Sequence, residues 1–97
     1  MADFYISAIK MDGAGQHIEF VKVHKNLGTT FGPGRAISRA FIGELIQTGR
    51  IEFRTITKTQ AQTSWSIGAK VEVTAQGYIT THANKTTLDN LGNLPTF

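Results

Sequence analysis

The chain has no cysteine, only two prolines and one tryptophan among its 97 residues. The lack of cysteine excludes a disulfide framework and thiolate metal sites, and is typical of a reducing compartment. No apolar run approaches the roughly 20 residues of a membrane-spanning helix, and no charged-then-apolar leader opens the chain. We therefore expect a cytoplasmic protein that has no membrane partner.

Clusters of chemically reactive residues are also missing. The histidines are His17, His24 and His82, and none has the spacing of metal ligands on a helix. The seven acidic residues show no pairing suited to acid–base catalysis, and there is no Gly-x-Ser-x-Gly nucleophile motif. We expect a protein that is not an enzyme, with no catalytic residues, no metal site and no cofactor.

The remaining composition is that of one folded domain, residues 1–97. Hydrophobic residues make up 40% and charged residues 18%, as in ordinary globular proteins, and this length supports one core. Alternation of apolar and polar residues predicts strands at 4–11, 18–25, 51–59, 69–75 and 78–81. The turn at 12–15 predicts a hairpin between the first two strands, whereas 26–37 and 60–66 are predicted as connections.

One amphipathic helix is predicted between the second and third strands. Ser38 is a suitable N-cap, and Gly49 suits the left-handed residue that follows a helix. The residues between them form one apolar stripe, which consists of Phe41, Ile42, Leu45 and Ile46.

The predicted order ββαβββ indicates an α+β fold. We expect an antiparallel sheet of about five strands, with room to curl toward a partial barrel, backed by the helix. The segment 82–97 is irregular, but Leu91, Leu94 and Phe97 recur at every third position, which favours packing on the core. The same apolar residues also fit a tail that contacts a partner.

The net charge of +3 is distributed unevenly. From Lys22 to Lys58 there are seven basic residues and two acidic ones, whereas the rest of the chain has an acidic excess. Such asymmetry can create a positive face that attracts anions, although the charges can also scatter around the surface on folding.

The best candidate for a ligand site is the connection that leads into the helix. Glycines let the backbone approach a ligand, and the free amides of a helix start, joined by two arginines, suit a phosphate or carboxylate. A flexible surface loop with solvated arginines is the alternative explanation of the same residues. Trp65, near the end of a loop, is the best candidate for an exposed aromatic platform. The predicted ligand-binding residues are Gly32, Gly34, Arg35, Ser38, Arg39 and Trp65.

Two functions are therefore compatible with the sequence. The leading hypothesis is a non-enzymatic protein that binds or sequesters a small anionic, nucleotide-like ligand. The alternative is an interaction module that binds a protein or nucleic acid through a basic face or a sheet edge. The sequence leaves homo-oligomer formation open.

Two segments of the chain resemble a known family. Tyr78-Ile79-Thr80-Thr81, followed by Asp89-Asn90-Leu91-Gly92-Asn93-Leu94-Pro95, is similar to the closing strand and tail of the domain-of-unknown-function family 3892, which is found in bacteria and phages. Ser38-Arg39, at the start of a helix that ends at Gly49, resembles the helix of the same family. The family has no established activity, so the resemblance implies no function.

Overall fold

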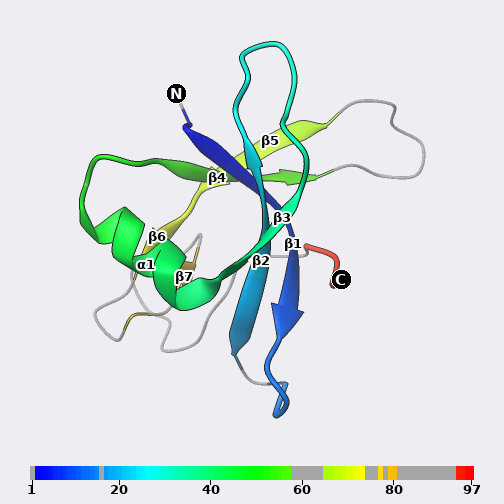
Figure 1. Ribbon diagram of the computed structural model, residues 1–97, viewed down its shortest axis with the longest axis vertical. Helices are drawn as coiled ribbons and strands as arrows, with labels where there is room; N and C mark the ends of the chain where they lie inside the picture. Colours follow the sequence, from blue (N-terminus) through cyan, green and yellow to red (C-terminus); the bar gives the residue numbers. More distant parts are fainter. Residues whose placement is uncertain (1, 16, 58–64, 74–76, 78, 81–93) are drawn as a thin grey trace.

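The computed structural model describes residues 2–15, 17–57, 65–73, 77, 79–80 and 94–97. The elements in chain order are β1 (Phe4–Met11), β2 (Ile18–Lys25), β3 (Arg35–Ser38), α1 (Arg39–Gln47), β4 (Phe53–Thr57), β5 (Ser66–Lys70), β6 (Glu72–Val73) and β7 (Ile79–Thr80). Five strands form one sheet in the order β3-β2-β1-β4-β5, and β6 pairs with β7 in a second, smaller sheet. α1 lies against one face of the larger sheet, which confirms the α+β fold (Figure 1).

The N-terminal hairpin is present with the predicted bounds. β1 and β2 pair antiparallel from Phe4↔Lys25 to Met11↔Ile18. The turn is held by the side chain of Asp12, whose Oδ1 accepts a hydrogen bond from the amide of Ala14 at 3.1 Å. A glycine is required at position 15, where φ is 69°.

The sheet is mixed, and in this respect the expectation of an antiparallel sheet was wrong. β4 pairs with β1 in parallel, from Phe4↔Phe53 to Ile6↔Thr55. The chain leaves β2, passes through β3 and α1, and then returns on the opposite side of β1. A crossover of this kind, which contains a helix, brings the next strand into parallel alignment.

Two strand assignments also differ from the predictions. β3 begins within the predicted connection 26–37, ends at Ser38, and pairs antiparallel with β2, from Val23↔Arg35 to Phe20↔Ser38. Its four residues are too short for a clear alternation, and they follow a segment rich in glycine. β5 begins at Ser66 rather than at residue 69, and Val71 separates it from β6. The parts of the predicted strands and loops at 58–64, 74–76, 78 and 81 lie outside the described residues.

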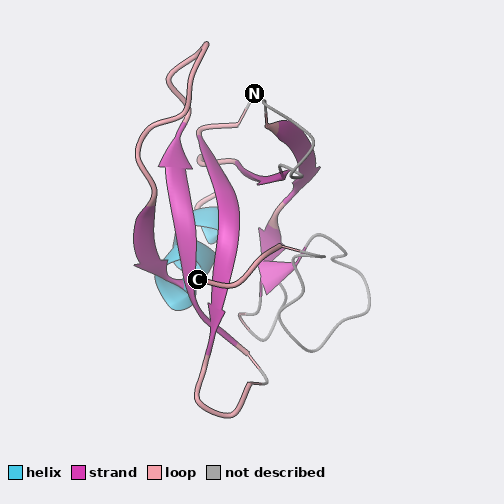
Figure 2. Cartoon of the chain, turned by 90° about the vertical axis from the view of Figure 1, so that its right-hand side faces the viewer, coloured by secondary structure: helices cyan, strands magenta, loops and turns pink. Residues whose placement is uncertain are grey.

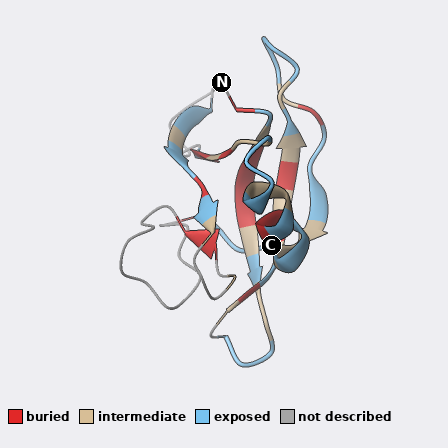
Figure 3. Ribbon diagram, turned by 90° about the vertical axis from the view of Figure 1, so that its left-hand side faces the viewer, coloured by how far each residue is buried: buried red, intermediate tan, exposed pale blue. Residues whose placement is uncertain are grey.

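The main core lies between α1 and the sheet. Its buried residues come from both sheets, the helix and the C-terminal segment, and they are among the buried parts of the chain drawn red in Figure 3. Ile42 of α1 and Phe53 of β4 are each 1% exposed. The helix stripe is thus confirmed in part: Ile42 is buried, Leu45 and Ile46 are half-buried, and Phe41 is exposed.

The described part of the C-terminal segment pairs with β1, and its end lies on the side of the sheet away from α1 (Figure 2). Thr96 forms a parallel bridge with Ile9, and the amide of Ile9 donates to the carbonyl of Pro95 at 2.9 Å. Leu94 is buried in the main core, as predicted, whereas Phe97 is exposed. Leu91 lies outside the described residues. No helix in the described part of the chain is long and apolar enough to cross a membrane.

Candidate functional site

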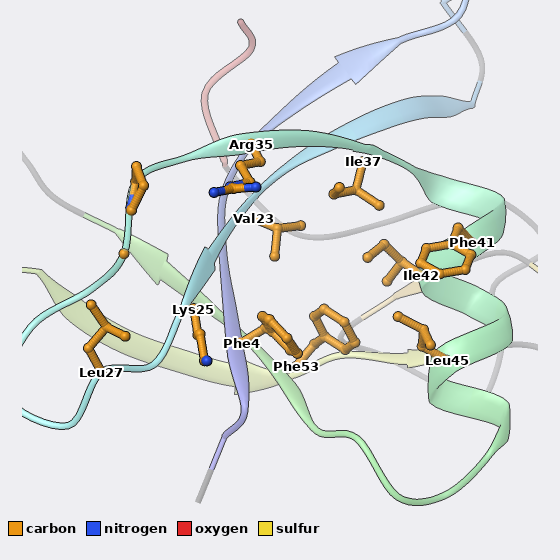
Figure 4. A pocket seen from close by; sticks show the side chains of 12 residues that line it. Phe4, Val23, Lys25, Leu27, Arg35, Ile37, Phe41, Ile42, Leu45 and Phe53 are labelled. Atoms are coloured by element: carbon orange, nitrogen blue, oxygen red, sulfur yellow. The ribbon is translucent and has the colours of Figure 1, made fainter.

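A cavity of about 450 Å³ lies on the helix-covered face of the sheet, between α1 and the loop that joins β2 to β3. We call it the helix-face cavity (Figure 4). Its lining residues come from four strands, the helix and this loop. They are Phe4, Val23, Lys25, Leu27, Gly32, Pro33, Arg35, Ile37, Phe41, Ile42, Leu45 and Phe53.

Strand alternation places two cations beside this cavity. Side chains two residues apart on a strand share a face, so Lys25 lies on the same face as Val23. Arg35 is the register partner of Val23 in β3 and shares that face too. Figure 4 shows Lys25 and Arg35 at the loop side of the cavity, away from the helix.

The opposite wall of the cavity is hydrocarbon. Phe41, Ile42 and Leu45 project from α1, and their spacing puts them on one side of the helix (Figure 4). Phe4 and Phe53 from adjacent strands stack with ring centroids 5.3 Å apart and an interplanar angle of 20°. Phe41 is 50% exposed, so the apolar wall reaches the surface.

The loop beside the cavity is fastened to the sheet through His24. The ring Nδ1 of His24 donates to the carbonyl of Gly32 at 2.9 Å, because a carbonyl can only accept. The other ring nitrogen, Nε2, is hydrogen-bonded to the hydroxyl of Ser7 at 2.7 Å. A carbonyl, a histidine and a serine linked in this order resemble the arrangement that activates a catalytic serine. Ser7, however, is only 4% exposed. We interpret the chain of hydrogen bonds as a structural tie that positions Gly32.

The two cations of the cavity have no partners among the described residues: neither side chain forms a hydrogen bond or an ion pair there. Arg54 is different, because its Nε donates to Glu52 Oε2 at 2.9 Å and its Nη1 to the carbonyl of Gly68 at 3.2 Å. The hydrogen bond from Arg54 lowers the pKa of Glu52 below its ordinary value of 4.5. Arg54 is thus occupied, whereas Lys25 and Arg35 are exposed and have no protein partner in the described part of the chain.

The structure separates the six residues that were predicted to bind a ligand. Gly32 and Arg35 line the helix-face cavity. Gly34 instead packs against the other face of β2, where an added Cβ would lie 2.6 Å from Lys22 Cε and 3.0 Å from His24 Cε1. Ser38 caps the helix as predicted, with its Oγ accepting from the amide of Phe41 at 3.2 Å.

Arg39 is in the first turn of α1, as predicted, but its side chain binds the protein itself. Its Nε donates to the carbonyl of Ile18 at 3.3 Å, and its Nη1 to the carbonyl of Gly77 at 3.0 Å. These carbonyls offset the unfavourable position of a cation at a helix N-terminus. Ser38 and Arg39 therefore have structural roles, and the predicted cluster at the helix start is not assembled around an open site.

Replacing Arg39 with alanine is accordingly expected to destabilise the fold rather than to empty a ligand site. Loss of charge-assisted hydrogen bonds to two carbonyls should lower the free energy of unfolding by about 1–3 kcal/mol. A urea melt of the variant measures this change. Arg50→Ala, which alters an exposed arginine after the helix, is the control, and equal stability of the two variants would contradict the structural role of Arg39.

Trp65 lies on the opposite face of the sheet, outside the cavity. Its ring is 6.1 Å from that of His24 and 6.4 Å from that of Phe31, which in turn packs edge-on against Tyr5 at 4.8 Å. At 38% exposure it remains partly accessible. Trp65 therefore does not contribute to the same site as Arg35.

Sequence reasoning missed most of the cavity. The overlooked residues include Lys25, Leu27 and the exposed Phe41. Phe41 was assigned to the core because it belongs to the apolar helix stripe. Lys25 could have been found from its two-residue spacing from Val23, but only if β3 had been recognised as the strand beside it.

Comparison with known proteins shows the family of the chain. No curated protein and no solved structure matches the chain. Residues 5–95, nearly the whole chain, match the family described as "Protein of unknown function (DUF3892)". The resemblance to this family is therefore confirmed, and the chain belongs to the DUF3892 family.

Proposed function

We propose that this protein is a non-enzymatic binder of a small organic anion, which it holds in the helix-face cavity. The observation that carries this proposal is a pair of exposed cations, Lys25 and Arg35, which have no partner among the described residues and lie beside an apolar cavity of about 450 Å³. Cavities of roughly 300–1,000 Å³ with a few convergent polar groups are typical of small-molecule sites.

The arrangement of the two cations supports an anionic ligand. Lys25 is two residues beyond Val23, the partner of Arg35, so the two charges are diagonal neighbours on one face. Such neighbours are separated by about 7–8 Å across an antiparallel pair. Like charges this close repel each other, and a bound anion would remove the repulsion. Arg35 can also hold a carboxylate or phosphate through two hydrogen bonds.

A thermal-shift screen tests the proposal. The panel contains nucleoside monophosphates, cyclic dinucleotides and organic carboxylates. An anion present at 100 times its Kd should add about 2.7 kcal/mol to the stability of the protein. The double variant Lys25→Gln with Arg35→Gln should lose this stabilisation, whereas Arg50→Gln, which removes an exposed charge outside the cavity, should keep it. Binding that survives in the double variant would place the anion elsewhere.

A second candidate is a module that binds a protein or nucleic acid through a sheet edge. β5 is one of the two edge strands of the five-stranded sheet, and it carries the exposed Ile67 near Trp65. An exposed edge offers backbone groups to an added strand, and an aromatic ring offers a surface on which bases stack. Binding of a nucleic acid should weaken steeply with salt because counterions are released.

A further inference from the structure

The lining of the helix-face cavity indicates which class of anion it accepts, an inference that rests on the function proposed above. Apart from Lys25 and Arg35, the described lining residues are aliphatic, aromatic, glycine or proline. Within that set no side chain offers a hydroxyl, an amide, an imidazole or a carboxylate. A nucleobase and a ribose carry several polar groups, and each such group loses free energy if it is buried without a partner. The lining therefore disfavours a nucleotide and suits a ligand with a hydrocarbon body.

The contacts that the cavity offers also restrict which charged head group the ligand can carry. Phosphates are commonly bound by backbone amides at a helix N-terminus or in a glycine loop. Here the amide of Phe41 is bonded to Ser38 Oγ at 3.2 Å, and the amide of Gly32 to the carbonyl of Lys25 at 2.9 Å. Among the described lining residues, the polar side chains that can contact a head group are those of Lys25 and Arg35. These suit a compact carboxylate, which an arginine can bind through both oxygens.

We infer that the ligand is a lipophilic carboxylate of the medium-chain fatty acid type. Its carboxylate lies between Lys25 and Arg35 at the loop side, and its chain lies along Phe4, Phe41 and Leu45 toward the helix (Figure 4). The two ends of the cavity thus match the two ends of an amphiphile. Such a molecule is recognised by charge at one end and by hydrocarbon along the rest of its length.

The inference is tested by titration calorimetry on the full chain with three probes. These are decanoate, kept below the concentration at which it forms micelles, the neutral 1-decanol and the nucleotide AMP. Decanoate should bind at least about tenfold more tightly than decanol, the factor expected from a charge-assisted hydrogen bond. AMP should bind more weakly than decanoate.

Three variants localise the binding. Lys25→Gln with Arg35→Gln should reduce the affinity for decanoate to that for decanol and leave decanol unchanged. Phe41→Ala, at a site that is 50% exposed and so tolerant of change, should weaken both decanoate and decanol. Arg50→Gln should alter neither.

The possible results separate this inference from the proposed function. Equal affinity for decanoate and decanol would overturn the role of the two cations. Tighter binding of AMP than of decanoate, lost in the Lys25 and Arg35 double variant, would reject the lipophilic carboxylate but leave an anion site in place. Binding of none of the three probes would reject the lipophilic class, and failure of the whole anion panel would reject the proposed function as well.

A second copy of the chain could cover the cavity instead of a small ligand. Light scattering should then show a dimer that Phe41→Ala dissociates, and this result too would overturn the inference.

Discussion

Replacing Phe53 with alanine should lower the free energy of unfolding by about 3–5 kcal/mol, the usual cost of truncating a buried phenylalanine. Phe53 is 1% exposed and stacks on Phe4 at 5.3 Å, so the change leaves a cavity at the centre of the main core. Domains of this size are stable by only about 5–15 kcal/mol. The variant should therefore unfold at a much lower urea concentration than the parent protein.

Phe41→Ala is the matched control, because it removes the same atoms from a residue that is 50% exposed. Its cost should stay below about 1 kcal/mol, as for most surface changes. If the two variants lost equal stability, the assignment of Phe53 to the core and of Phe41 to the rim of the cavity would be wrong.

Deletion of residues 94–97 should lower the melting temperature by roughly 10–20 °C, since about 2–3 kcal/mol of stability is lost in a domain of this size. Leu94 is 7% exposed within the main core. The deletion also breaks the hydrogen bonds of Ile9, whose amide donates to Pro95 at 2.9 Å and whose carbonyl accepts from Phe97 at 3.0 Å. A calorimetric melt measures the change.

The single substitutions Leu94→Ala and Phe97→Ala show how much of this loss of stability each side chain accounts for. Most of the loss should appear in Leu94→Ala, because Leu94 is 7% exposed, whereas Phe97 is 45% exposed and its ring faces the ammonium group of Lys22 at 6.0 Å. An unchanged melting temperature after the deletion would mean that the segment is free to bind a partner.

Local chemistry was sufficient to predict several elements from the sequence. Alternation of apolar residues located β1 and β2 with their observed bounds. Ser38 and Gly49 were placed correctly at the two ends of the helix: Ser38 is the N-cap, and Gly49, with φ of 73°, follows the C-cap Thr48. These features depend on residues within a few positions of one another, so the sequence alone is enough to show them.

The parallel pairing of β4 with β1 and the assembly of the candidate site required the tertiary structure. Lys25 and Arg35 become neighbours only because β3 pairs with β2, and β3 alone is too short to show a period. Arg39 was assigned to a ligand because its partners, the carbonyls of Ile18 and Gly77, lie 21 and 38 residues away along the chain. The sequence by itself determined the hairpin, the helix and their apolar faces, since local periodicity and capping specify them. Only the tertiary structure decided which cations became structural and which stayed beside the cavity, because that choice depends on how distant strands pair and which carbonyls they leave exposed.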